Sequence, residues 1–174
     1  MAIISATEFH LAQFNFARAR FQPDDARMKD FVDALDEINQ LSEQAPGFIW
    51  RLQTEAGHSI DVRPFPDDDL KLITLSVWKD VESLRQFVYR GGHLGFLKRR
   101  DTWFEAPREP YLVLWWKDRN HIPSVSEGMD RLSHLTRFGP SPHAFDFRTV
   151  FDATGHLLKS GAPQPEERHR IAEG

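Results

Sequence analysis

The order in which the hydrophobic period changes along the chain restricts the fold more than any other feature. Residues 9–16 alternate in the manner of a strand. Between Asp25 and Pro46 the apolar side chains recur every three or four residues, which predicts an amphipathic helix. Residues 48–54 and 70–78 are rich in β-branched and aromatic side chains and are again typical of strands. The first half therefore has the order strand, helix, strand, strand.

The second half repeats the helix and the strand. Asp80 is placed to cap a helix, which Gly91 and Gly92 interrupt. Residues 111–116 form a fourth predicted strand that is apolar on both sides. The order β-α-β-β-α-β is that of the ferredoxin-like unit, whose antiparallel sheet carries two helices on one face. The predicted fold class is therefore α+β.

Two further elements follow this unit. A capping box at residues 124–127 opens another helix. Residues 145–151 alternate strictly, which predicts a late strand that joins the sheet or reaches a second subunit. We assign residues 8–152 to one domain, and we expect the polar residues 153–174 to be a poorly ordered tail.

Charge and cysteine content exclude several classes of function. The 22 Lys and Arg against 26 Asp and Glu give a net charge of −4, so no basic field attracts nucleic acid or anionic lipid. The absence of Cys excludes disulfides, thiolate nucleophiles and Cys-based metal sites. The N-terminus lacks the features of a signal peptide, and no apolar stretch is long enough to span a membrane. We expect a cytoplasmic protein without a nucleic-acid partner or a membrane span.

The aromatic content predicts a ligand or a partner. The chain has 5 Trp and 14 Phe, and Trp50, Trp78, Trp115 and Trp116 fall on or beside predicted strands. Two helices on one face of a sheet leave the other face uncovered. An apolar patch there would be closed by a homodimer or would line a cavity for a hydrophobic small molecule. The alternative is an unusually aromatic core, covered by the helix that begins near Ser124.

Several stretches together resemble the domain-of-unknown-function family 3291, over about residues 8–151. They are LAQFN at 11–15, PGFIWRL at 46–52, LSVWKDVESLRQFVY at 75–89, PYLVLWW at 110–116 and GPSPHAFDF at 139–147. The resemblance implies the dimeric α+β barrel superfamily, in which two ferredoxin-like sheets pack face to face and each subunit keeps a pocket between sheet and helices. This superfamily includes cofactor-independent monooxygenases, haem-degrading oxygenases, aldoxime dehydratases and a spheroidene oxygenase.

The resemblance directs attention to His93. The succession of a strand, Trp78 and a following His is similar to the pattern in the spheroidene oxygenase and in the haem-degrading enzymes. In the haem-degrading enzymes, however, the proximal His falls about one helical turn later, at the position of Leu97 in this chain. His93 would then ligate haem iron, with Arg90 and Arg99 receiving the propionates. A neutral imidazole is also a general base near pH 7, and a hydrogen-bonded structural His is the third interpretation. No other metal site is expected.

Eight side chains are candidates for a substrate pocket, because they place polar or aromatic groups on or near the predicted sheet. They are Gln13, Asn15, Trp50, Arg51, Trp78, Tyr89, Trp103 and Trp115. The polar members would orient a ligand or would be ordinary polar residues at a sheet edge. Trp78 and Trp115 are the expected walls, and Tyr89 would donate through its phenol or only pack.

These observations lead to two classes of function. The first is an oxygenase-like enzyme, haem-dependent or cofactor-independent, that acts on a hydrophobic substrate and uses His93. The second is a non-catalytic carrier or accessory protein of a biosynthetic pathway that binds its ligand in the same pocket. A purely structural dimer with a filled core is the remaining alternative. The sequence leaves the substrate and the reaction open.

Overall fold

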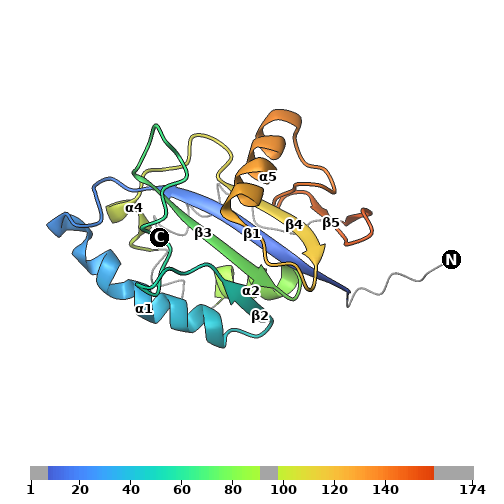
Figure 1. Ribbon diagram of the computed structural model, residues 1–174, viewed down its shortest axis with the longest axis horizontal. Coiled ribbons are helices and arrows are strands. Elements are labelled where there is room, and N and C mark those ends of the chain that lie inside the picture. The colour runs from blue at the N-terminus through green and yellow to red at the C-terminus, as the bar shows by residue number, and fades with distance from the viewer. Residues whose placement is uncertain (1–7, 91–97, 159–174) are drawn as a thin grey trace.

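A four-stranded antiparallel sheet forms the centre of the protein (Figure 1). The computed structural model describes residues 8–90 and 98–158. The strands are β1 (Phe9–Arg18), β2 (Phe48–Arg51), β3 (Lys71–Trp78) and β4 (Leu112–Asp118), in the spatial order β2-β3-β1-β4. This is the ferredoxin-like arrangement, so the predicted α+β fold class is confirmed.

The helices begin where the sequence placed their caps. Asp25 accepts a hydrogen bond from the backbone of Arg27 and opens the short helix η2 (Ala26–Met28), which continues into α1 (Lys29–Gln44). Asp80 accepts from the backbone N–H of Ser83 at 2.8 Å at the start of α2 (Val81–Arg90). A short helix, α4 (Arg100–Trp103), precedes β4. Both predicted helices of the ferredoxin-like unit are therefore present.

The strand register assigns each side chain to one face of the sheet. Gln13 of β1 lies opposite Ser76 of β3, whereas Phe14 lies opposite Leu75 of β3 and Val113 of β4. Successive side chains of a strand point to opposite faces. Gln13 and Ser76 therefore share one face, here called the helix-side face, and Phe14 lies on the other face.

Helices α1 and α2 contribute to two separate apolar clusters on the helix-side face. Leu84 of α2 belongs to a buried cluster with Leu11 and Trp78 of the sheet. Phe31 and Leu35 of α1 belong to another, which contains Leu72 of β3. On β1 and β3, the residues of this face that lie between Leu11 and Leu72 in the register, other than Trp78, belong to neither cluster. The middle of this face is therefore left to other side chains.

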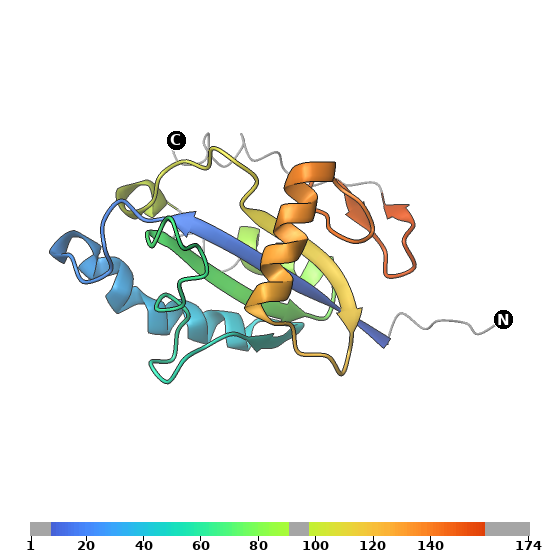
Figure 2. The ribbon, with the colours of Figure 1, turned by 45° about the horizontal axis from the view of Figure 1, so that its top comes forward.

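Helix α5 (Val125–Phe138) covers the opposite face of the sheet. In Figure 2 it crosses in front of β1 and β4, whereas α2 lies behind the strands. Ser124 accepts from the backbone N–H of Glu127 at 3.1 Å, as the capping box predicts. Leu132 and Leu135 of α5 are buried in one cluster with Phe14 and Trp115 of the sheet. The chain thus encloses its own aromatic face, and an uncovered face no longer argues for a homodimer.

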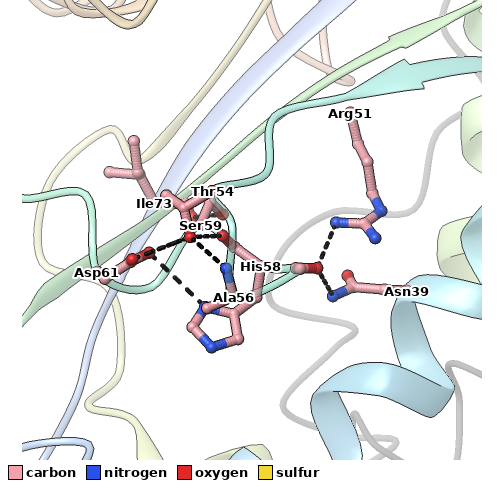
Figure 3. Close-up of polar contacts among 9 residues, drawn as sticks. Asn39, Arg51, Thr54, Ala56, His58, Ser59, Asp61 and Ile73 are labelled. Carbon is pink, nitrogen blue, oxygen red and sulfur yellow. Dashed lines mark hydrogen bonds and ion pairs between the residues drawn. The ribbon is translucent and has the colours of Figure 1, made fainter.

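The connection between β2 and β3 completes this cover. The second strand is shorter than predicted and ends at Arg51, because the backbone of Thr54 turns to bond the carbonyl of His58 at 2.9 Å. The hydroxyl of the buried Ser59 donates to the carbonyl of Ile73 at 2.7 Å and holds the connection against β3 (Figure 3). Phe65 then packs edge-on against Phe16 of β1, with ring centroids 5.1 Å apart.

The predicted late strand at 145–151 is wrong for most of its length. Phe145 forms only an isolated bridge with Leu114 of β4. The carboxylate of Asp146 accepts from the backbone of Arg148 and Thr149, and such local bonds turn the chain out of a strand. Only β5 (Val150–Phe151) is extended, and it pairs with β6 (Leu157–Leu158). The two strands of this hairpin lie on either side of the domain boundary predicted at residue 152.

None of the helices in the described part of the chain is both long and apolar enough to cross a bilayer.

Candidate functional site

A row of polar side chains lies in the middle of the helix-side face, between the two apolar clusters. It consists of Gln13 and Asn15 of β1 and Thr74, Ser76 and Trp78 of β3, and we call it the polar row. Polar groups beneath helices cost free energy unless they are hydrogen-bonded. Five such residues in continuous contact therefore need an explanation beyond packing.

The members of the polar row are joined by one chain of hydrogen bonds. The indole Nε1 of Trp78 donates to Ser76 Oγ at 2.9 Å, and Ser76 Oγ donates to Gln13 Oε1 at 2.8 Å. Gln13 Nε2 donates to Asn15 Oδ1 at 2.8 Å. Thr74 Oγ1 donates to the same Asn15 oxygen. Cross-strand register makes these contacts, since Gln13 lies opposite Ser76 and Asn15 opposite Thr74.

The polar row changes from buried to accessible along its length. Trp78 is 1% and Gln13 7% exposed. Asn15 is half-buried, and Thr74 is exposed at a position of β3 that lies past the end of its pairing with β2. The side chains of α1 and α2 therefore leave this part of the sheet open to solvent. A site that combines apolar walls with a few fixed polar groups is typical of small-molecule binding.

Arg51 lies beside the polar row but is held by other groups. It is in register with Ser76. Its Nε donates to Glu43 of α1 at 2.8 Å and its Nη1 donates to the carbonyl of Gly57 at 2.9 Å. Figure 3 shows Arg51 and Asn39 converging on that carbonyl. Arg51 thus ties β2 to α1 and to the following turn, and its hydrogen bonds are directed away from the polar row.

The tryptophans expected to share a pocket are distributed over different parts of the protein. Trp115 is fully buried on the face beneath α5, and Trp50 packs against the same cluster. Trp103 lies in the cluster of α1, with its ring centroid 5.9 Å from that of Phe31. Only Trp78 lies in the polar row. The two sheet faces therefore divide the predicted wall residues, because Trp78 and Trp115 point to opposite sides.

The remaining candidates surround α2 and α4. Tyr89 of α2 makes an edge contact with Phe147, with ring centroids 6.0 Å apart. His93 and the side chain of Arg90 lie outside the described residues. Arg99 donates to Asp30 at 2.9 Å, and its guanidinium lies 4.7 Å from the centre of the Trp103 ring.

Haem ligation by His93 stays a prediction, because His93 lies outside the described residues. No group of His, Asp and Glu in the described part of the chain is arranged to hold a metal ion. Arg99, which was expected to receive a propionate, is engaged by Asp30.

A polar centre beneath α5 was missed by the sequence reasoning. Glu127 Oε1 accepts from Trp115 Nε1 at 3.0 Å, and Glu127 Oε2 accepts from His121 Nε2 at 2.6 Å. Arg131, one turn later, lies 3.8 Å from the same carboxylate. Although burial raises the pKa of Glu127, the hydrogen bonds from His121 and Trp115 hold it below its ordinary value. The capping box identified Glu127 but did not indicate that its carboxylate reaches the sheet.

Replacement of Glu127 by Gln is expected to reduce stability in a pH-dependent way. A carboxylate whose folded pKa is lowered stabilises the fold above its ordinary pKa of 4.5, and this contribution is lost as the pH falls through the lower folded value. Glu127→Gln should cost about 1 kcal/mol at pH 7, where a charged hydrogen bond becomes a neutral one. Urea denaturation between pH 7 and pH 3 measures it. A difference between the proteins that stays constant across this range would contradict the prediction.

The same face ends in a buried lysine. Lys117 is 6% exposed, and its Nζ donates to the backbone carbonyl of Asp118 at 2.8 Å. Burial lowers the pKa of Lys117, and burial followed by the charges of Lys117 and Arg119 lowers the pKa of His10, which lies opposite on β1. These groups lie on the α5 side of the sheet and are separated from the polar row by the sheet itself.

A cavity of about 430 Å³ lies between the end of β1 and the loop before β4. Most of its charged side chains form ion pairs with one another. Arg18 bonds Asp68 at 2.8 Å and Glu105 at 2.7 Å, and Lys71 bonds Glu109 at 2.7 Å. Because these ion pairs connect the loop to the sheet, we assign them a structural role. The polar row is therefore the better candidate for a binding site.

Comparison with known proteins gives a family and two distant structural neighbours. No curated protein matches the chain. SnoaB, a cofactor-independent oxygenase from Streptomyces nogalater, is 14% identical and has a TM-score of 0.40, over 67% of this chain and 99% of its own. A protein of unknown function from Nitrosomonas europaea, NE2512, is 12% identical with a TM-score of 0.41, over 68% of this chain and 96% of its own.

Both TM-scores are below 0.5, so the fold assignment rests on the strand order described above. The family match is more extensive, since it spans residues 10–160 of the 174 residues. It includes every strand and helix of the described chain except the first residue of β1. The chain belongs to the family described as a domain of unknown function, DUF3291.

Proposed function

We propose that the polar row is the floor of a binding site for a small, mainly apolar molecule that carries one hydrogen-bonding group. The observation behind this proposal is the accessibility of Asn15 and Thr74 in the middle of a sheet face on which helices pack. A face that served only as core would be apolar and closed there. The hydrogen bonds among the polar row instead hold its open end in one arrangement.

The surroundings of the polar row suit such a ligand. On one side lie Leu84 and Phe87 of α2, which pack with the cluster around Trp78. On the other side lies the cluster of α1 with Leu72. Apolar walls supply most of the binding free energy of a small ligand, and a few polar groups fix its orientation. Trp78, stacked on Phe87 with ring centroids 5.1 Å apart, connects the wall to the floor.

The activity we propose for this site is oxygenase-like, acting on a hydrophobic substrate. It follows from the family resemblance, with His93 as general base or as haem ligand. The alternative is a carrier or accessory protein that binds the same ligand without turnover. Titration of the full chain and of His93→Ala with haemin separates the two forms of the enzyme proposal. A sharp Soret band that saturates near one haem per chain, and is absent from the variant, supports the haem-dependent form.

A homodimer and a cytoplasmic location also remain proposals. A dimer interface would have to use a surface other than the sheet face that α5 covers. Large apolar side chains are exposed elsewhere, at Ile49, Ile122, Phe138, Leu157 and Leu158. Sedimentation velocity of the full chain at several concentrations tests for a dimer.

Binding to the polar row is expected to raise the thermal stability of the full chain, measured with 2-acetylnaphthalene as the probe. A ligand at 100 times its Kd stabilises the folded state by about 2.7 kcal/mol. Thr74→Phe places a ring in the open end of the polar row and should abolish the shift in melting temperature. Ser133→Phe, on the exposed side of α5, is the matched control and should retain it. If the melting temperature of Thr74→Phe still rises with the probe, the probe binds at another site. If the melting temperature of the wild type does not rise, the proposal is wrong.

A further inference from the structure

The hydrogen bonds of the polar row run in one direction from Trp78 through Ser76 and Gln13 to Asn15. An indole N–H donates and never accepts, so Ser76 Oγ is the acceptor of that bond. The Ser76 hydroxyl donates its proton to Gln13, which presents its carbonyl Oε1. Gln13 Nε2 donates in turn to Asn15 Oδ1. The two amides are thus oriented by a continuous chain of donors that begins at Trp78.

The open end of the polar row consequently presents N–H groups. Asn15 Oδ1 accepts from both Gln13 and Thr74, which occupies its two lone pairs. Asn15 Nδ2, the other branch of the amide, has two protons and no hydrogen-bond partner within the described residues. Asn15 is half-buried and Thr74 beside it is exposed. A ligand that reaches this point meets a donor pair held in a fixed orientation.

Charge restricts the ligand further. The polar row contains no ionisable group, and Arg51, which among the described residues lies beside it in register, is paired with Glu43 and with the carbonyl of Gly57. A carboxylate or phosphate would lose its hydration without gaining a counter-charge. A neutral oxygen acceptor loses less hydration free energy than an anion when it moves from water into the site, and it can accept hydrogen bonds from the two amide protons.

We propose that Asn15 binds a carbonyl or phenolic oxygen of the ligand through Nδ2, and that Trp78, Ser76 and Gln13 are positioning residues that hold this amide in its donor orientation. The proposal rests on the proposed function, because it names the chemical class that the same site accepts. The ligand is an apolar, ring-containing molecule with a neutral oxygen acceptor at one end. Thr74 contributes its proton to Asn15, so its oxygen remains able to accept a proton from a ligand hydroxyl.

Two probes of the same shape test the donor role of Asn15. 2-Acetylnaphthalene carries a carbonyl oxygen, and 2-isopropenylnaphthalene has a methylene group in its place. Isothermal titration of the full chain should show that the ketone binds about tenfold more tightly than the alkene, because one additional hydrogen bond makes a net contribution of about this size. Asn15→Leu should bind both probes equally. Asn15→Asp, which replaces the donors by acceptors, should bind the ketone more weakly than the alkene.

The positioning role is tested at Ser76, which contacts no ligand atom in this scheme. Ser76→Ala breaks the chain between Trp78 and Gln13 and should reduce the preference for the ketone to about threefold or less, because it weakens binding of the ketone more than binding of the alkene. Ser76→Thr keeps the hydroxyl and should restore the tenfold preference. A residue that only supported the fold would change both affinities together. Melting temperatures of the variants without ligand confirm that they are folded.

The outcomes separate the two proposals. If neither probe binds the wild type, the proposed binding site is overturned and the donor role with it. If both probes bind the wild type with equal affinity, the site stands and the donor role of Asn15 is wrong. If Ser76→Ala keeps the full preference for the ketone, Asn15 is a binding residue but Trp78 and Ser76 do not position it.

Discussion

Replacement of Trp115 by Ala is expected to lower the free energy of unfolding by about 3 to 5 kcal/mol, the usual cost of removing a large aromatic side chain from a core. Trp115 is fully buried between β4 and α5. Its loss would leave a cavity beneath the helix and would also remove the hydrogen bond to Glu127. Urea denaturation followed by far-UV circular dichroism measures the effect without depending on tryptophan fluorescence.

Trp116 provides the matched control for this variant. It is the next residue of β4, it is half-buried on the opposite face, and its indole donates to the carbonyl of Phe151 at 2.7 Å. Trp116→Ala removes the same atoms from a partly exposed position, so it should cost clearly less than Trp115→Ala. Equal costs for the two variants would show that α5 does not seal the sheet in solution. The face would then be available to a second subunit.

Replacement of Gly128 by Val is expected to destabilise the protein by about 2 to 3 kcal/mol, the range for overpacking a filled core. Gly128 allows α5 to approach β1, because a Cβ at this position would lie 2.6 Å from a ring carbon of Phe14 and 3.0 Å from its Cβ. Phe14 is fully buried on a central strand and has no room to retreat. The helix must therefore move away from the sheet.

Two comparisons isolate this contact. Ser133→Val introduces the same side chain on the exposed side of α5 and should change stability by no more than about 0.5 kcal/mol. In a Phe14→Leu background the cost of Gly128→Val should fall, because residues in contact are energetically coupled. Additive effects of the two substitutions would mean that the helix does not rest on Phe14.

The covering of the sheet separates what the sequence predicted from what it missed. Strand order, the ends of α1, the beginning of α2 and the cap at Ser124 all follow from local patterns, and the structure confirms them. The prediction at 145–151 failed although its alternation was strict, because Asp146 redirects the backbone through its own carboxylate. Periodicity indicates which side chains are buried. Phe145 and Phe147 are buried as the pattern indicates, although they do not lie on a continuous strand.

The candidate site was predicted in part for a similar reason. Gln13 and Asn15 stood out as polar residues in an aromatic strand, and Trp78 stood out in the family resemblance. Their partners Thr74 and Ser76 did not, because they become neighbours only through the register between β1 and β3. Glu127 was likewise visible as a capping residue, but its contact with Trp115 depends on where α5 lies.

By itself the sequence determined the α+β class, the β-α-β-β-α-β order and the family of this protein, since hydrophobic period and helix caps act over a few residues. The tertiary structure decided that α5 covers the aromatic sheet face and that the two tryptophans expected as walls lie on opposite sides. It also decided that an amide at the open end of the polar row presents its N–H groups. These outcomes depend on cross-strand register and on packing between distant segments, which no local pattern specifies.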